Sequence, residues 1–118
     1  MTTTALDLHV EDREGVRIVR VAGPLDSATH DAFKNFLDPL VVQPHSRIVL
    51  DCGNLAYVNS RGLTLLARYQ RVAASNLSFF GIAAVNVRIC KAIDLLGLGK
   101  MMKLYPSVDE ALRAAAAP

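Results

Sequence analysis

The chain has 118 residues, of which 52% are hydrophobic and 20% are charged, and its formal net charge is +2. This length and apolar content predict one folded domain with a hydrophobic core and exclude a disordered protein. The thirteen Lys and Arg residues form no basic run, and no apolar segment is long enough for a bilayer, so we expect neither direct nucleic-acid binding nor a membrane span.

The N-terminal part of the chain predicts a β-hairpin. Apolar and polar residues alternate over 6–11, a pattern typical of a half-buried strand, and residues 16–21 form a second apolar strand. A turn that ends in Gly15 joins the two segments, which favours antiparallel pairing. We expect Gly23 and Pro24 to end the second strand.

A helix is expected next. Asp26 or Ser27 is a suitable cap, because a short oxygen-bearing side chain accepts hydrogen bonds from the free amides of the first turn. Pro39 should kink this helix or mark its last turns, since it lacks an amide donor. One apolar stripe at helical spacing defines the buried side, which consists of Phe33, Phe36, Leu37, Leu40 and Val41.

The compact apolar segment RIVLD, residues 47–51, predicts a strand that is covered on both faces. A short polar loop is expected after it, followed by a helix that ends at Asn76. The apolar side of this helix is expected to contain Leu63, Leu66, Ala67, Gln70 and Ala74.

The last third of the chain predicts another buried strand and two more helices. Residues 77–84 have the composition of the strand, Asn86 is expected to cap the third helix, and Gly97 suits the left-handed position at that helix's end. Residues 101–105 indicate a short edge strand. An S-x-x-E capping box begins at Ser107 and predicts the start of the last helix.

These elements follow one another in the order β-β-α-β-α-β-α-(β)-α, where the bracketed strand is the short one. Strands separated by helices predict parallel pairs joined by right-handed crossovers, and the opening hairpin adds an antiparallel strand. We therefore expect a single α/β domain over residues 1–118, with a mixed four- to five-stranded sheet and about four helices. Its core should span about residues 6–113, with short disordered ends.

The cysteines and histidines predict neither a metal site nor a cofactor. Cys52 and Cys90 are far apart, and His9, His30 and His45 lie near different predicted elements, so they form no recognisable ligand set. We interpret them as two buried thiols and three surface or boundary histidines. The N-terminus lacks the basic and apolar regions of a signal peptide, and we expect a cytoplasmic protein.

The junction after Asp51 contains the main candidate functional residues. Asn59, Ser60, Arg61 and Gly62 crowd the start of a helix, where one capping residue would be enough. A catalytic Ser60 would need the motif G-x-S-x-G, but the first glycine is missing and no histidine follows, so we expect no enzyme. Ser60 could instead be the cap, or Asn59 could cap the helix and leave the Ser60 hydroxyl available for modification.

Three segments together resemble the STAS domain family and, within it, the bacterial anti-sigma factor antagonists. They are GPLDSAT, IVLDCGNLAYVNSRGLTLL and VNVRICKAIDLLGLGKMMKLYPSVDEAL, and the similarity covers about residues 6–113. In this family a strand ending in Asp leads to an aromatic-apolar pair and then to Asp-Ser-Ser/Thr-Gly at a helix start. Asp51, Tyr57-Val58 and Ser60-x-Gly62 match that pattern.

The resemblance implies partner switching by a monomer or weak dimer. In such proteins the unphosphorylated antagonist binds an anti-sigma factor, itself a serine kinase, and thereby releases a sigma factor. The kinase phosphorylates the first Ser of the motif, here Ser60, which breaks the complex, and a serine phosphatase reverses the modification. The partner-binding residues expected from the resemblance are Gly23, Pro24, Leu25, Asp26, Val58, Asn59, Ser60, Arg61, Gly62 and Arg68.

Two positions depart from the family's motif. Asn59 replaces the usual acid and Arg61 replaces the second hydroxyl residue, so the local charge moves from negative towards positive. A positive side chain at a helix N-terminus opposes the macrodipole, and a phosphate on Ser60 could compensate for it. The alternative function is a soluble STAS scaffold or accessory subunit of a signalling or lipid-transport complex, without a phospho-switch.

Overall fold

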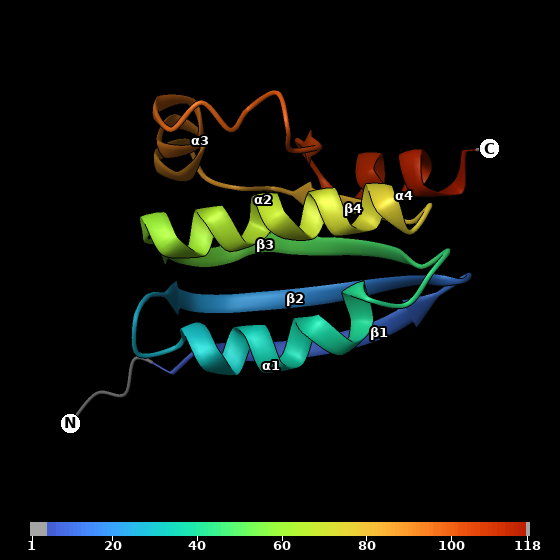
Figure 1. The fold of residues 1–118 in the computed structure, drawn as a ribbon, viewed down its shortest axis with the longest axis horizontal. Coiled ribbons are helices and arrows are strands. Elements are labelled where there is room, and N and C mark those ends of the chain that lie inside the picture. The colour runs from blue at the N-terminus through green and yellow to red at the C-terminus, as the bar shows by residue number, and fades with distance from the viewer. Residues whose placement is uncertain (1–4, 118) are drawn as a thin grey trace.

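The computed structural model describes residues 5–117. Of the ends expected to be disordered, residues 1–4 and 118 lie outside this range, whereas residues 114–116 belong to the last helix. Within residues 5–117 the chain forms five strands and four helices in the predicted order (Figure 1). The strands are β1 (Asp7–Arg13), β2 (Val16–Leu25), β3 (Arg47–Val58), β4 (Phe79–Ala83) and β5 (Leu104–Tyr105). The helices are α1 (His30–Val41), α2 (Ser60–Ser75), α3 (Val87–Leu95) and α4 (Val108–Ala116). None of these four helices is both long and apolar enough to span a lipid bilayer.

The strands form one mixed sheet in the order β1-β2-β3-β4-β5. β1 and β2 are antiparallel, whereas β2, β3, β4 and β5 are parallel neighbours. The helices α1 and α2 lie against one face of this sheet, and α4 lies behind it, on the opposite face (Figure 1). The predicted single α/β domain with a mixed sheet is therefore confirmed.

Alternate residues of the central strands contribute to two hydrophobic cores. Ile48 and Leu50 of β3 belong to the larger core, which α1, α2 and α3 cover, whereas Val49 between them packs with residues of α4. All three side chains are at most 1% exposed, so the segment RIVLD is covered on both faces as predicted. Ala74, which was expected on the apolar side of its helix, is exposed, and the adjacent Ala73 packs into the core in its place.

Several local predictions are confirmed at the ends of the elements. The hairpin turn contains Gly15 at a φ of +84°, and Gly97 follows α3 at a φ of +71°, in the left-handed region that glycine favours. Asn86 caps α3 and Ser107 caps α4, each by accepting a hydrogen bond from the amide three residues later. These ends depend on interactions between residues close together in the sequence, so they can be predicted from it directly.

The prediction that Gly23 and Pro24 end the second strand is wrong. β2 continues through both residues to Leu25, with an irregular register between Gly23 and Pro24. Pairing with β1 stops at Ala22, so beyond that point no strand formed by residues 5–117 lies along this edge of β2. A proline is tolerated there, because its missing amide removes no hydrogen bond from the sheet.

The prediction that a loop begins directly after Asp51 is also wrong. β3 runs on from Asp51 to Val58 and pairs with the extended part of β2, although its pairing with β4 stops at Asp51. The polar residues Gly53 and Asn54, which suggested a loop, are exposed within this strand. Long-range pairing to β2 therefore overrides a local composition that disfavours a strand.

The predicted cap of the first helix is wrong as well. α1 begins at His30, and its N-cap residue Thr29 makes no side-chain capping hydrogen bond. Asp26 instead closes the turn before the helix, where its Oδ1 accepts hydrogen bonds from the amides of Ala28 and Thr29 at 3.0 and 3.2 Å. Pro39 lies in the last turn of α1, as predicted.

Candidate functional site

The ends of β2 and β3 bring the two predicted functional segments together. Leu25 pairs with Val58 in the parallel ladder, and the amide of Asn59 donates to the carbonyl of Leu25 at 3.0 Å. The loop from β2 to α1 and the start of α2 therefore lie side by side at the carboxyl edge of the sheet, where binding sites of α/β proteins collect. Residues 23–26 and 58–62 are therefore close together in space.

The cap of α2 is Asn59. Its backbone is extended, with φ −81° and ψ 173°, and its Oδ1 accepts a hydrogen bond from the amide of Gly62 at 2.8 Å. Ser60 becomes the first helical residue, and its side chain is exposed and forms no hydrogen bond within residues 5–117. Of the two possibilities for capping, the structure realises the one that leaves the Ser60 hydroxyl free.

Gly62 allows the start of α2 to approach the strand ends closely. It is buried, and a Cβ at this position would lie 2.9 Å from the Cγ1 of Val58 and 3.0 Å from the Cγ of Leu25. Both distances are shorter than an ordinary contact between carbon atoms. The glycine of the motif therefore fixes how the serine-bearing turn sits on β2 and β3.

Two positive side chains lie on the exposed side of α2, Arg61 in this first turn and Arg68 two turns further along. Arg61 and Arg68 are both exposed and lie seven residues apart, hence nearly on one line of the helix. The first turn of α2 contains no acidic residue, so the helix supplies nothing to offset the unfavourable position of Arg61 near its N-terminus. No ion pair joins either arginine to a carboxylate within the described part of the chain.

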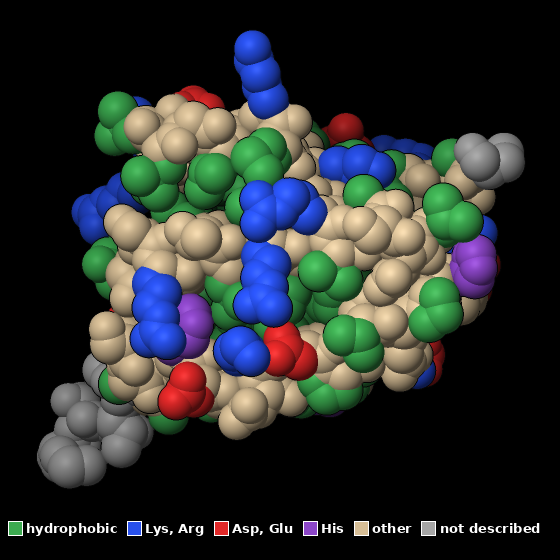
Figure 2. Space-filling view, viewed as in Figure 1, with side chains coloured by type: hydrophobic (Ala, Val, Ile, Leu, Met, Phe, Trp, Pro, Cys, Tyr) green, Lys and Arg blue, Asp and Glu red, His purple; other side chains and the backbone are tan. Residues whose placement is uncertain are grey.

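A small apolar hollow opens on one side of Ser60. It has a volume of about 240 Å³ and is lined by Tyr57, Val58, Ser60, Leu63, Leu95 and Leu96, among others. Tyr57 is 54% exposed and Leu95 is 87% exposed, so large hydrophobic surfaces face solvent next to the hydroxyl. Figure 2 shows hydrophobic side chains gathered in the region where Figure 1 places α3. The contribution of α3 was missed from the sequence.

A second hollow lies on the other side of Ser60, between α1 and α2. Its volume is about 340 Å³, and we call it the cationic groove, which is lined by His30, Lys34, Arg61, Thr64, Leu65 and Arg68. Figure 2 shows several Lys and Arg side chains over this part of the molecule. His30 was expected at the surface or a boundary, but it is buried, because α1 begins with it and turns it towards the core.

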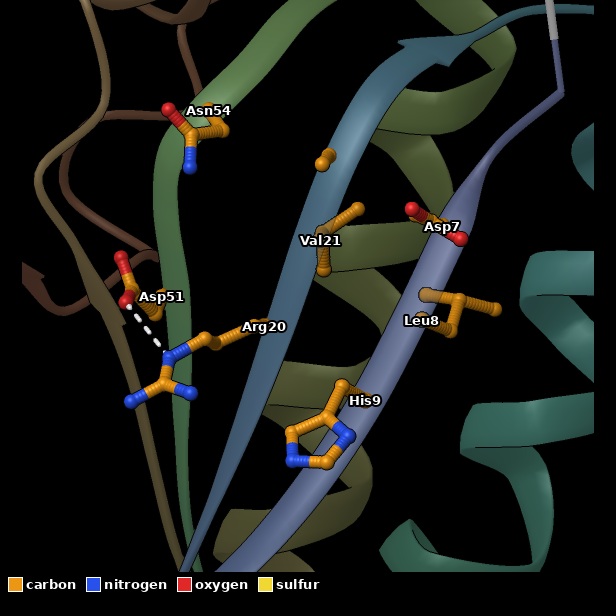
Figure 3. Close-up of a pocket in the computed structure, with 8 residues that line it drawn as sticks. Asp7, Leu8, His9, Arg20, Val21, Asp51 and Asn54 are labelled. Atoms are coloured by element: carbon orange, nitrogen blue, oxygen red, sulfur yellow. Dashed lines mark ion pairs between the residues drawn. The ribbon is translucent and has the colours of Figure 1, made fainter.

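A third hollow, on the opposite face of the sheet, does not belong to this site. It has a volume of about 360 Å³ and contains Arg20 and Asp51 (Figure 3). The guanidinium of Arg20 lies 3.8 Å from Asp51 and 3.0 Å from Glu11, so charges within the chain already compensate one another. The Asp51 side chain also accepts a hydrogen bond from the amide of Gly53 at 3.1 Å. Asp51 thus supports β3 and does not meet Ser60.

The cysteines and acidic residues offer no further candidate site in residues 5–117. No group of three or more His, Cys, Asp and Glu side chains in this range is arranged to hold a metal ion. Cys52 is buried as expected, and burial raises the pKa of its thiol far above the ordinary value. Cys90 is only half buried, contrary to expectation, because it lies on the outer side of α3.

Comparisons with known proteins agree with this arrangement. The STAS domain model matches residues 7–111. An anti-sigma F factor antagonist of Paenibacillus polymyxa is 31% identical over 109 residues, which are 91% of this chain and 92% of that protein. The anti-sigma-F factor antagonist RsfB of Mycobacterium tuberculosis is 25% identical and covers 92% of this chain and 88% of its own length. The crystal structure of an anti-sigma factor antagonist from Mycobacterium paratuberculosis superposes with a TM-score of 0.86, at 30% identity over 98% of both chains.

Proposed function

Because this chain belongs to the STAS domain family, we propose that it is an anti-sigma factor antagonist, a regulatory binding protein without catalytic activity. In this proposal it binds an anti-sigma factor that is also a serine kinase, as a monomer or weak dimer in the cytoplasm. Phosphorylation of Ser60 breaks the complex, and a serine phosphatase restores it. The names of the relatives support the antagonist role, and the geometry of α2 supports the choice of Ser60.

The observation that carries the proposal is that one residue caps α2 and the next residue exposes its hydroxyl. Asn59 caps the helix through its 2.8 Å hydrogen bond, whereas the hydroxyl of Ser60 is exposed and has no structural partner within residues 5–117. A group can therefore be attached to Ser60 without removing a bond that holds the fold. A serine that served as the cap would lose that role on modification.

The consequences of phosphorylation follow from charge. The kinase would transfer the γ-phosphoryl group of ATP to the Oγ of Ser60, with loss of the hydroxyl proton and release of ADP. The ester adds about 1.5 to 2 negative charges at neutral pH. In the free protein, the amides and dipole at the helix N-terminus favour this charge, and Arg61 supplies a nearby cation. In a complex, the partner would have to desolvate the same charge.

The proposed partner surface keeps the residues expected from the resemblance. Asp26, Asn59, Ser60, Arg61 and Arg68 are at least partly accessible, as are Gly23 and Pro24. Leu25, Val58 and Gly62 are buried, so their role would be to hold the accessible residues in place. This assignment combines the two segments that the strand ends bring together.

Calorimetric titration with the purified anti-sigma factor tests the proposal. We expect Ser60→Ala to bind like the wild type but to accept no phosphate from ATP, and Ser60→Asp to bind about one to four decades more weakly, since one uncompensated charge at an interface costs about 2–5 kcal/mol. The double variant with Ser60→Asp and Arg61→Ala should bind more weakly still. Ser75→Asp, which adds the same charge at the far end of α2, is the matched control and should bind normally.

Equal affinities across this set of variants would contradict the switch. The protein would then fit a scaffold or accessory subunit, in which Ser60 has no regulatory part. Phosphate incorporation that persists in Ser60→Ala would instead place the modified residue elsewhere.

A further inference from the structure

The helix α2 carries an unusual charge distribution. Its sequence SRGLTLLARYQRVAAS contains three arginines and no acidic residue. Arg61, Arg68 and Arg71 are all exposed, and Arg61 and Arg68 lie nearly on one line of the helix, because seven residues are close to two whole turns. These two arginines line the cationic groove, whereas Arg71 lies outside its lining.

Acidic residues of the neighbouring helix form no ion pair with these arginines. Asp38 of α1 accepts hydrogen bonds from the Nζ of Lys34 at 2.8 Å and from the hydroxyl of Tyr69 at 2.6 Å, so both its oxygens are engaged. The three arginines form no ion pair within residues 5–117. Figure 2 shows Lys and Arg side chains, with Asp or Glu side chains beside them, on the face that α1 and α2 form. The lining of the groove contains Lys34, Arg61 and Arg68 and no acidic residue, although the charge of Asp38 still interacts favourably with Arg68.

One unfavourable feature of the groove would be relieved by an anion. Arg61, which lines the groove, lies at the positive end of the α2 dipole, with no acid in the same turn.

We propose that the cationic groove binds an acidic segment of the anti-sigma factor, with carboxylates of that segment facing Arg61 and Arg68. This inference rests on the proposed function, and it specifies the chemistry of the partner. It also extends the interface from the start of α2 along the helix and onto Lys34 of α1.

The direction of the proposed switch supports an acidic partner. A basic partner surface around Ser60 would attract a phosphate, and phosphorylation would then strengthen the complex. An acidic segment beside Ser60 is repelled by the phosphate, which also competes with it for Arg61. Release on phosphorylation therefore agrees with carboxylates in the groove.

A protein segment fits the groove better than a nucleic acid or an anionic membrane. The positive residues of the groove are Arg61 and Arg68 on one line of α2 and Lys34 on α1, and Asp31 adds an exposed negative charge to α1. A phosphate backbone or a headgroup layer needs a broader positive surface. Carboxylates on a single strand or helix of a partner match one line of arginines.

Charge reversal on α2 provides the test. Arg68→Glu lies away from the Ser60 turn, and Arg113→Glu on α4, on the other face of the sheet, is the matched control. In calorimetric titrations with the purified anti-sigma factor, Arg68→Glu should weaken binding roughly tenfold or more. The control should bind like the wild type, and the wild-type affinity should fall as salt is raised. Circular dichroism and urea unfolding establish that all variants fold.

A second measurement does not depend on the anti-sigma factor. A deca-glutamate peptide added at low salt should shift the amide resonances of α2 and of α1 around Lys34, and the Arg68→Glu variant should lose these shifts. Absence of such shifts, shifts centred on α4, or equally tight binding of a short DNA oligonucleotide or of anionic phosphatidylglycerol vesicles would overturn the inference.

Different results would refute the acidic segment and the phospho-switch. If Arg68→Glu binds the anti-sigma factor like Arg113→Glu while Ser60→Asp binds weakly, the acidic segment is refuted and the phospho-switch stands. If Ser60→Asp binds like the wild type, the phospho-switch is refuted whatever the arginine variants do.

Discussion

Substituting the capping residue Asn59 and the hydroxyl residue Ser60 separately gives the sharpest test of the structure. Asn59→Ala removes the acceptor of the 2.8 Å hydrogen bond from the amide of Gly62. Loss of an N-cap of this kind lowers the free energy of unfolding by about 0.5–2 kcal/mol. Ser60→Ala removes an exposed hydroxyl without a partner in the described chain, and surface substitutions of that kind change stability by about 0.5 kcal/mol at most.

Urea unfolding followed by circular dichroism measures this difference. For a small domain the dependence on urea is about 1–3 kcal/mol per molar, so a loss of 1 kcal/mol lowers the midpoint by roughly 0.3–1 M. Asn59→Asp keeps an acceptor at the cap and adds a charge that the helix dipole favours, so it should unfold no earlier than the wild type. A larger loss for Ser60→Ala than for Asn59→Ala would refute the reasoning, because Ser60 would then be the structural cap.

Three further predictions concern stability. Leu66→Ala should lower the free energy of unfolding by about 2–5 kcal/mol, since this side chain is 1% exposed in the larger core, and the urea midpoint checks it. Gly62→Ala should cost about 1–3 kcal/mol, because its Cβ would meet a side chain of β3 at 2.9 Å, and calorimetric melting would show it. Although burial opposes ionisation, hydrogen bonds from Lys34 and Tyr69 hold the pKa of Asp38 below its ordinary value. Its contribution to stability is therefore present above the unfolded-state pKa of about 3.9 and is lost as the pH falls through the lower folded-state pKa, so Asp38→Asn should flatten the acid part of a stability–pH profile.

Local chemistry explains why much of the fold was predictable. Asn86 and Ser107 cap helices through bonds to amides three residues away, and Gly15 and Gly97 take left-handed conformations. Each feature depends on one residue and its immediate neighbours. The apolar segment at residues 47–51 was equally informative, because a strand covered on both faces leaves no room for polar side chains.

The strand ends were not predictable, because long-range pairing determines them. Residues 52–58 contain Gly53 and Asn54, whose local preference is for a turn, yet they continue β3 by pairing with the end of β2. Pro24 remains within β2 only because β1 no longer pairs beyond Ala22. No pattern within either segment reveals the neighbour that makes these conformations acceptable.

In the candidate site, too, local features were predictable from the sequence and long-range features were not. The turn around Ser60 could be located from the sequence, whereas the apolar hollow beside it requires α3 to fold back next to β3. One signal was available: Leu95 and Leu96 are adjacent at a helix end, and adjacent helical residues cannot both face the core. The cationic groove also needs the pairing of α1 with α2, which places Lys34 opposite the arginines.

Asn59 and Arg61 replace an acid and a hydroxyl residue of the family's motif. This change of charge affects the helix cap, the proposed phosphorylation of Ser60 and the proposed contact with the partner. An acid at position 59 would stand next to a phosphate on Ser60 and repel it, whereas the amide of Asn59 caps the helix without that repulsion. Arg61, in turn, is unfavourable at a helix N-terminus when no anion is present. An anion therefore stabilises this turn in both of the proposed states, as a carboxylate of the partner when Ser60 is free and as a phosphate when Ser60 is modified. In this proposal the two states differ in which anion Arg61 contacts, and competition for this one side chain would couple modification to release.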